Sequence, residues 1–321
     1  MKNKKTNVGI LGLGNMGRHH ARIYHELPSA NLLGIYDPNQ EKCQELAAQY
    51  NCKSYISTDE LLKNNHIEAI NIITPTNTHH EIALKTLKAN KHTFIEKPIS
   101  DCTKKATTIM TLAKEKKLKL MIGHIERFNP AIIKLKQLIN QKKLGSIISI
   151  HTKRIGPFPS QIKDANIMID LAIHDIDIVC DLMNKTPSKI TATTHNALIK
   201  DREDYAEIML SFDHQTAIIQ SNWISPKQER TLSILGTKGL IDLNYKTQEI
   251  TFYETKLENH TKTNPKFIET TPQKIPVESK EPLFLELSHF IDGIQNKSQI
   301  IPTGEVGLNA LKICETILNQ K

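Results

Sequence analysis

Residues 12–17 are GLGNMG, a G-x-G-x-x-G pattern between an apolar run and a stretch with helical spacing. In a strand–turn–helix unit, the first glycine permits a tight turn and the second lets backbone N–H groups approach a pyrophosphate. The third lets the helix pack close to the strand, and the helix N-terminus adds partial positive charge facing the phosphates. We therefore predict a dinucleotide site built from Gly12, Gly14, Asn15, Met16 and Gly17.

Asp37 closes the apolar run 32–37, about 20 residues beyond the glycine pattern, where such sites place an acid. Its carboxylate can accept hydrogen bonds from both hydroxyls of an adenosine ribose. A 2′-phosphate would meet that carboxylate at close range, so the sequence favours NAD over NADP as the cofactor. Arg18 and Lys42 lie near enough in sequence to weaken this preference.

The first 125 residues alternate between short apolar runs and stretches with helical spacing. This alternation predicts a parallel sheet covered by helices on both faces, with the ligand beyond the carboxyl ends of the strands. Asp59 and Asp101 stand where helix N-caps are expected. The expected strands are 7–14, 32–37, 69–75, 92–98 and 118–124, and the expected helices are 16–27, 39–50, 79–90 and 102–117.

Residues 126–321 have a different pattern, with consecutive strand-like runs joined by short turns. Such a pattern predicts a mostly antiparallel sheet that is open on one face, so the chain is expected to be α/β with two domains, 1–125 and 126–321. The C-terminal helix can pack back on the first domain. The expected strands are 145–154, 188–196, 205–212, 216–224, 229–236 and 249–254, with turns at 213–215 and 236–239, a loop over 255–281, and helices near 165–184, 282–297 and 305–319.

Composition narrows the class of protein. The 321 residues carry a formal net charge of +8, but the lysines are spread along the chain without a basic block. No apolar run approaches the ~18 residues that span a membrane. We expect neither a nucleic acid nor a membrane as a partner, although a basic cleft for a phosphate-bearing small molecule is compatible with the charge. Five scattered cysteines without a C-x-x-C pair predict no metal site and fit a cytoplasmic location.

Lys97 is the first candidate for chemistry. It stands in FIEKPIS, at the end of the fourth strand-like run, where a nicotinamide ring bound in this fold would face a substrate. Pro98 restricts Lys97 to extended conformations, which helps to aim the side chain. By itself the pattern favours a surface Lys-Pro turn over a catalytic lysine.

Asp170 and His174 form the second candidate pair, four residues apart inside a helical run. Side chains at i and i+4 share a face of a helix, so the carboxylate and the imidazole can meet one ligand. Histidine suits proton transfer near neutral pH. A salt-bridged helix with a core histidine is the structural alternative, and the presence of the dinucleotide loop and Lys97 in the same chain favours a catalytic role.

In this ordered set of motifs the chain resembles the Gfo/Idh/MocA family of oxidoreductases. The family implies a Rossmann domain and a second α/β domain whose open sheet often forms an oligomer interface, here a homodimer or homotetramer. It implies Lys97, Asp170 and His174 as the catalytic residues, with cofactor-side contacts from Thr74, Pro75, His79 and Glu96. The matching stretches are GLGNMG, YDPN, TPTNTHHEIAL, FIEKPIS, DLAIHD and PTGEVGLNALKI.

Residues 123–131 and 154–159 are most similar to family members that oxidise the 3-hydroxyl of UDP-N-acetylglucosamine. This similarity implies a nucleotide-sugar substrate bound by Lys97, Arg127, Arg154 and His174, with the two arginines on its phosphates or, alternatively, in ordinary ion pairs. His174 would take the hydroxyl proton and Lys97 would stabilise the oxygen, although these two roles can be exchanged. The alternatives are an inositol or free-sugar dehydrogenase and an NAD-sensing regulatory protein that does no chemistry.

Overall fold

The computed structural model describes residues 5–159, 165–258 and 266–320. The chain divides into two compact units. Unit 1 contains residues 1–125 and 281–312, and unit 2 contains residues 126–280 and 313–321. The long helix α9 (Gly304–Leu318) begins in unit 1 and ends in unit 2.

Unit 1 is built on a six-stranded parallel sheet, as the strand–helix alternation predicts. The strand order is β3-β2-β1-β4-β5-β6. The chain adds β2 and β3 on one side of β1 and then β4, β5 and β6 on the other side, while all strands stay parallel. Only the two-residue β3 was not expected. The strands are β1 (Thr6–Leu11), β2 (Ala30–Tyr36), β3 (Lys53–Ser54), β4 (Ala69–Ile72), β5 (His92–Glu96) and β6 (Leu120–Gly123).

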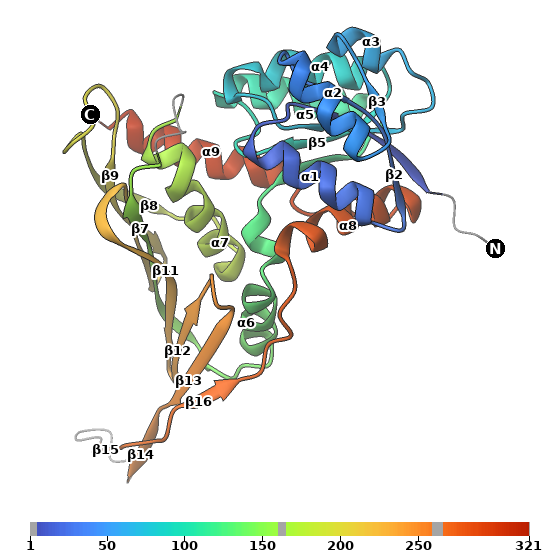
Figure 1. Ribbon diagram of the computed structural model, residues 1–321. Helices are drawn as coiled ribbons and strands as arrows, with labels where there is room; N and C mark the ends of the chain where they lie inside the picture. The colour runs from blue at the N-terminus through green and yellow to red at the C-terminus, as the bar shows by residue number, and fades with distance from the viewer. Residues whose placement is uncertain (1–4, 160–164, 259–265, 321) are drawn as a thin grey trace. The chain divides into compact units, whose positions relative to one another are not determined.

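Helices cover both faces of this sheet (Figure 1). Tyr24 of α1 donates a hydrogen bond to Asn71 of β4 at 2.9 Å on one face. Leu61 of α3 lies on the other face, against Gly9 of β1. The helices of unit 1 are α1 (Asn15–Glu26), α2 (Gln40–Gln49), α3 (Thr58–Leu62), the short 3₁₀ turn η1 (Thr76–Thr78), α4 (His79–Lys88), α5 (Thr103–Glu115) and α8 (Pro282–Gln295).

Two predicted helix caps are wrong. The N-cap of α3 is Ser57, whose hydroxyl accepts from the Glu60 N–H at 3.1 Å, so Asp59 lies inside the first turn. The N-cap of α5 is Cys102, and Asp101 lies before it, paired with Lys105 at 2.6 Å. Both errors are of one or two residues, because several polar residues at a helix start compete for the cap position.

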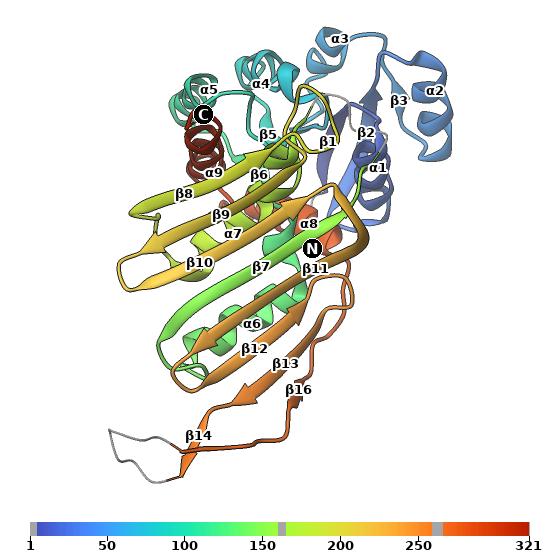
Figure 2. The same cartoon turned by 90° about the vertical axis from the view of Figure 1, so that its left-hand side faces the viewer.

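Unit 2 is built on an eight-stranded mixed sheet of order β16-β13-β12-β11-β7-β10-β9-β8, in which only β7 and β10 are parallel. Figure 2 shows this sheet face on, with α6 and α7 behind it. Its strands are β7 (Ile147–Pro157), β8 (Lys189–His195), β9 (Tyr205–Phe212), β10 (Gln215–Asn222), β11 (Ile224–Gly236), β12 (Gly239–Asn244), β13 (Glu249–Glu254) and β16 (Gln273–Ile275).

The sheet of unit 2 has one covered and one open face. In β7, Ile150, Thr152 and Arg154 are buried on the face that α7 contacts, whereas His151 on the open face is exposed. The sheet is therefore mostly antiparallel and open on one side, as predicted. The helices of unit 2 are the 3₁₀ turn η2 (Ile125–Phe128, which starts at the unit boundary), α6 (Pro130–Asn140), the π-helical turn η3 (Met168–Ala172) and α7 (Ile173–Met183).

Several sequence expectations for unit 2 need correction. β12 was not among the expected strands, because its alternation covers just six positions. The expected loop 255–281 contains β14 (Lys256–Glu258), β15 (Lys266–Ile268) and β16, three strands of three residues each, and its residues 259–265 lie outside the described residues. The predicted turns at 213–215 and 236–239 are present. Among the described residues, no helix has the length and apolarity needed to cross a membrane.

Candidate active site and dinucleotide-binding loop

The glycine loop joins β1 to α1 with almost no spare room. Gly12 has φ of +95°, and a Cβ there would lie 2.4 Å from the carbonyl oxygen of Ile73. A Cβ on Gly17 would lie 2.1 Å from the carbonyl oxygen of Gly12, so this residue sets how closely α1 approaches the loop. Gly14 differs, because no heavy atom outside its neighbours lies within 4 Å of its Cβ position. The loop thus fits a dinucleotide, with open space at the glycine that would approach the pyrophosphate.

Asp37 follows β2 and lies against this loop. Its Oδ2 accepts from the Leu13 N–H at 2.7 Å, and its Oδ1 accepts from the Asn39 N–H at 2.9 Å. A carboxylate has about four lone-pair sites, so each oxygen can accept one more hydrogen bond. The half-buried carboxylate is therefore held by backbone groups while it keeps the capacity to bind two ribose hydroxyls.

His79 joins two strand-end loops of unit 1. Its Nε2 lies 2.8 Å from the Thr74 carbonyl oxygen after β4, and its Nδ1 lies 2.8 Å from the Pro98 carbonyl oxygen after β5. The ring is only 1% exposed. His79 therefore supports the loop that carries Thr74 and Pro75 from behind, whereas the sequence analysis expected it to face the cofactor itself.

Glu96 holds the turn that carries Lys97. One carboxylate oxygen of Glu96 lies 3.2 Å from Nε2 of His20 on α1, and the other accepts the Lys97 N–H at 3.1 Å. A Cβ on Gly123 of β6 would come within 3.0 Å of the same carboxylate. Lys97 is half-buried, and its peptide bond to Pro98 is cis. The sequence analysis missed His20, because nothing local distinguishes it from the neighbouring His19.

Asp170 and His174 lie at the junction of η3 and α7, and both are half-buried. The Ile173 N–H bonds to the Met168 carbonyl, an i to i−5 contact that defines the π turn. Asn166 starts the segment by accepting the Ile169 N–H at 3.2 Å. The predicted i, i+4 pair therefore spans a π turn and not a uniform α-helix. Such turns occur frequently at functional sites.

Arg127 is engaged by two carboxylates of α7. Its Nε and one terminal nitrogen donate to the two oxygens of Asp177, each at 2.7 Å, and the other terminal nitrogen donates to Asp181 at 2.6 Å. Burial acts to lower the pKa of Arg127, but these carboxylates outweigh it and hold the pKa above its ordinary value. The structure therefore favours the ion-pair alternative for Arg127 over contact with a substrate phosphate.

Arg154 is still more enclosed, at 2% exposed. Its guanidinium donates to both oxygens of Asp175 at 2.9 and 3.1 Å and to Glu126 at 2.7 Å, and it lies 4.8 Å from the centre of the Tyr245 ring. Burial raises the pKa of Asp175, against the opposing effect of Arg154. The substrate contact expected of Arg154 is thus replaced by an interior ion pair, since the guanidinium is neither exposed nor unengaged.

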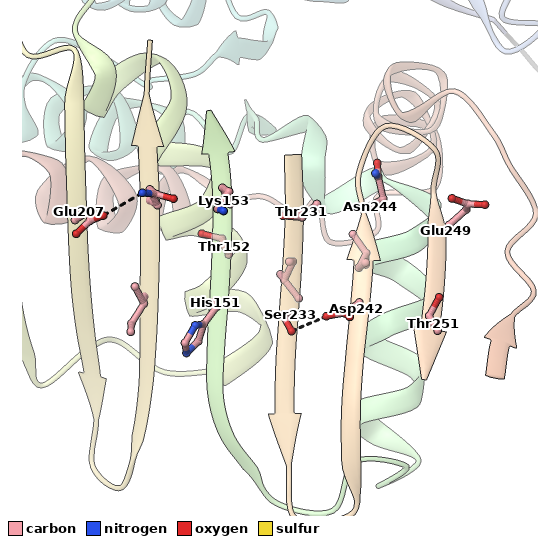
Figure 3. A pocket seen from close by; sticks show the side chains of 14 residues that line it. His151, Thr152, Lys153, Glu207, Thr231, Ser233, Asp242, Asn244, Glu249 and Thr251 are labelled. Carbon is pink, nitrogen blue, oxygen red and sulfur yellow. Dashed lines mark hydrogen bonds between the residues drawn. The ribbon is translucent and has the colours of Figure 1, made fainter. Parts of the chain in front are cut away.

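A shallow hollow of about 580 Å³ lies elsewhere, on the open face of the unit 2 sheet (Figure 3). Gln220 donates to Glu207 at 3.0 Å and Ser233 donates to Asp242 at 2.7 Å across its floor. None of the predicted site residues lines it. No group of three or more metal-ligating side chains with suitable geometry occurs in residues 5–159, 165–258 and 266–320.

Comparison with known proteins identifies both parts of the chain. Residues 6–124 match the Gfo/Idh/MocA oxidoreductase family, NAD-binding Rossmann fold, and residues 136–321 match its C-terminal alpha/beta domain. The chain belongs to the Gfo/Idh/MocA family of oxidoreductases. The resemblance inferred from the motifs is therefore confirmed, and the protein is an NAD-dependent dehydrogenase with an NAD-binding Rossmann domain.

Individual relatives of this family are similar along the whole chain. A UDP-N-acetylglucosamine 3-dehydrogenase of Acidithiobacillus ferrooxidans is 27% identical over 305 residues, which cover 95% of this chain and 93% of that protein. Its solved structure matches with a TM-score of 0.85 at 25% identity and covers 98% of this chain and 96% of its own. An inositol 2-dehydrogenase of Rhizobium meliloti is 24% identical and covers 97% of this chain and 95% of its own.

Proposed function

We propose that this protein oxidises a secondary hydroxyl of a nucleotide sugar to a ketone, and that the hydroxyl is the 3-OH of UDP-N-acetylglucosamine. The observation that carries the proposal is the similarity, over 95% of the chain, to a relative of that name. The glycine loop, Lys97, Asp170 and His174 all lie within the matched domains. A sensor that only binds NAD would need the loop and Asp37 but not the other three residues.

NAD would be held by residues of unit 1. The N–H groups of residues 12–17 and the N-terminus of α1 would face its pyrophosphate, and Asp37 would accept from its adenosine ribose. Thr74 and Pro75 would contact it from the loop that His79 braces. When bound, NAD supplies the acceptor for the hydride that leaves the sugar carbon. Glu96 would hold the turn that carries Lys97 by accepting the Lys97 N–H.

The proton chemistry falls to Lys97 and His174, acting on one hydroxyl. His174 takes the hydroxyl proton as general base, a step typically worth about 10²–10⁴-fold. Lys97 donates a hydrogen bond to the same oxygen and stabilises its developing negative charge. Asp170 orients the imidazole or the sugar and favours the imidazolium that forms. Lys97 and His174 can exchange these roles without any change in the overall reaction.

Separate Lys97→Ala and His174→Ala variants test this assignment. Both should bind NAD with unchanged affinity and lose turnover by about 10²-fold or more. Lys104→Ala and His80→Ala are matched controls, because Lys104 is exposed on α5 and the ring of His80 contacts only Thr108 in the described hydrogen bonds. Full turnover in either test variant removes that residue from the chemistry.

The substrate is tested by following NADH absorbance with UDP-N-acetylglucosamine, myo-inositol and free sugars. The proposal expects the UDP-sugar to have the highest kcat/KM. An inositol dehydrogenase is the second candidate, supported by the 24% identity to an inositol 2-dehydrogenase over 97% of the chain. Faster oxidation of myo-inositol would select that candidate. NAD binding without turnover of any compound would leave the regulatory alternative.

We also propose that the open face of the unit 2 sheet binds a second copy of this chain, in a dimer or a tetramer. Met209 and Ile218 are direct cross-strand neighbours on that face and are 40% and 39% exposed. A Met209→Lys, Ile218→Glu double variant should convert the assembly to a monomer in light scattering. A wild-type protein that is already monomeric at micromolar concentration contradicts the proposal.

A further inference from the structure

Arg230 occupies a distinctive position in the unit 2 sheet. The pairing of β11 with β7 places it directly opposite Arg154. Side chains alternate along a strand, so Arg230 shares its face with the buried Leu232 and Ile234. This is the face that carries Arg154 toward Asp175 of α7, and it is opposite to the open face with its hollow. Arg230 is half-buried there.

Arg154, Asp175 and Glu126, the charged groups around Arg230, form hydrogen bonds with one another. Arg154 takes both oxygens of Asp175 and one oxygen of Glu126. In residues 5–159, 165–258 and 266–320, the Arg230 guanidinium has no ion pair and no side-chain hydrogen bond, whereas Arg154 and Arg127 each donate three side-chain hydrogen bonds. Arg230 is thus the arginine of this face whose five donors remain available.

The surroundings of Arg230 contain both like and opposite charges. Like charges directly opposite across two strands are destabilising. Burial, followed by the charge of Arg154, lowers the pKa of Arg230, while Glu126, Asp175 and Asp170 raise it. An arginine remains protonated in a protein, so the Arg230 guanidinium keeps its charge and its planar fork of donors.

We infer that Arg230 binds an anionic oxygen group of the substrate, opposite Arg154 on the helix-covered face of the unit 2 sheet. Its planar fork suits bidentate contact with a phosphate or a carboxylate. The inference rests on the proposed function in that the diphosphate of a nucleotide sugar would supply this group. It makes Arg230, and not Arg127 or Arg154, the residue that distinguishes an anionic sugar from a neutral one.

The test compares Arg230→Gln and Arg230→Lys with wild type on four compounds. UDP-N-acetylglucosamine carries a diphosphate, glucose 6-phosphate a single phosphate and glucuronate a carboxylate, whereas myo-inositol is neutral. Arg230→Gln should lower kcat/KM for the anionic compounds that the wild type uses by about 10-fold to 100-fold and leave myo-inositol within about 2-fold. Arg230→Lys should recover part of the loss, because it keeps the charge but not the fork.

Lys227→Gln is the matched control. It removes one positive charge from the same strand, at a side chain that is 77% exposed and paired with Glu229, and it should change none of these values. A comparable loss for neutral and anionic compounds in Arg230→Gln indicates a structural role and overturns the inference. An unchanged kcat/KM for the anionic compounds in Arg230→Gln also overturns the inference. The same holds if Arg230→Lys has a higher kcat/KM than Arg230→Gln for myo-inositol but not for the anionic compounds.

Direct binding separates this inference from the proposed function. Calorimetric titration with UDP, with inorganic phosphate and with acetate shows which anion the site takes, phosphate or carboxylate, without any turnover. If the wild type does not oxidise UDP-sugars but binds one of these anions about 10-fold more tightly than Arg230→Gln does, the proposed function fails and the inference stands. If the wild type binds none of the three anions, the inference fails whatever the substrate is.

Discussion

Asp37 in unit 1 and Asp175 in unit 2 are both carboxylates beside predicted functional residues, but they are held by different partners. Asp37 accepts from the backbone N–H groups of Leu13 and Asn39, and it stays half-buried. Asp175 accepts from the side chain of Arg154 and is buried. A carboxylate held by backbone N–H groups keeps its partners whatever side chains those residues carry, whereas one held by another charge depends on the identity of that one side chain.

Arg154→Met should give the largest effect that follows from this comparison. It leaves Asp175 buried without its partner, and breaking such a pair costs about 3–5 kcal/mol of unfolding free energy. Urea unfolding at neutral pH measures the loss, and an Arg154→Met, Asp175→Leu double variant should restore much of it. A double variant as unstable as the single one would show that the pair itself is not the cause.

The same variant has a pH dependence of defined sign. Without Arg154, burial and the charge of Glu126 keep the folded-state pKa of Asp175 above the unfolded value of about 3.9, against the smaller opposing effect of Arg230. A raised folded-state pKa contributes stability that is present below the unfolded pKa and is lost as the pH rises. The deficit of Arg154→Met relative to wild type should therefore shrink as the pH falls toward 4. A deficit independent of pH would contradict this explanation.

Asp204 sharpens the comparison, because it lies in unit 2 but is held by backbone, like Asp37. Its oxygens accept from the N–H groups of Ala197, Leu198 and Ile199 at 2.8, 2.6 and 2.7 Å. Burial acts to raise the pKa of Asp204, but these groups outweigh it and the pKa is lowered. Asp204→Asn should lose about 1.5–3 kcal/mol at neutral pH.

The pH profile of Asp204→Asn provides its control. A lowered folded-state pKa contributes stability that is present above the unfolded pKa of about 3.9 and is lost as the pH falls through the folded value. The wild type should therefore lose this advantage over Asp204→Asn below about pH 4. If the two proteins differ equally at neutral and acidic pH, the carboxylate charge is not what stabilises the 197–199 segment.

Two glycines of unit 1 separate packing from ligand binding. Gly17→Ala places a Cβ 2.1 Å from a backbone oxygen and should cost about 1–3 kcal/mol of unfolding free energy. Gly14→Ala meets no atom within 4 Å, so its stability should change by less than about 0.5 kcal/mol while NAD affinity falls. Thermal unfolding and NAD titration measure the two effects. A Gly17→Ala protein as stable as wild type would contradict the steric role of Gly17.

Asp37→Asn gives the smallest expected effect. It loses the charge that strengthens the hydrogen bonds to a ribose and places an NH2 group against the Leu13 or the Asn39 N–H, so NAD affinity should fall about 10-fold. NADP affinity should not fall, because a 2′-phosphate no longer meets a carboxylate. Fluorescence titration with both cofactors gives the ratio. An equal loss for NAD and NADP would mean that Asp37 supports the loop and does not select the cofactor.

The fold was largely predictable because its signals are local. The parallel order of unit 1 follows from alternating runs and a glycine pattern, and the long helices α8 and α9 were expected within a few residues. β12 and the three-residue strands after it carry too little periodicity to be recognised. The π turn at Asp170 was not predictable either, because a bond from Ile173 to Met168 leaves no pattern in the sequence.

The sequence by itself determined the NAD-binding loop, since Gly12 adopts a positive φ and a Cβ on Gly17 would meet the Gly12 carbonyl oxygen within the same motif. It also singled out Lys97, Asp170 and His174 by their place in motifs. Only the tertiary structure decided what the arginines do, because the partners of Arg127 and Arg154 are 50 and 21 residues away. A charge is neutralised by the groups that the fold brings beside it. Arg230 differs from the other two arginines because the described residues give its guanidinium no ion pair.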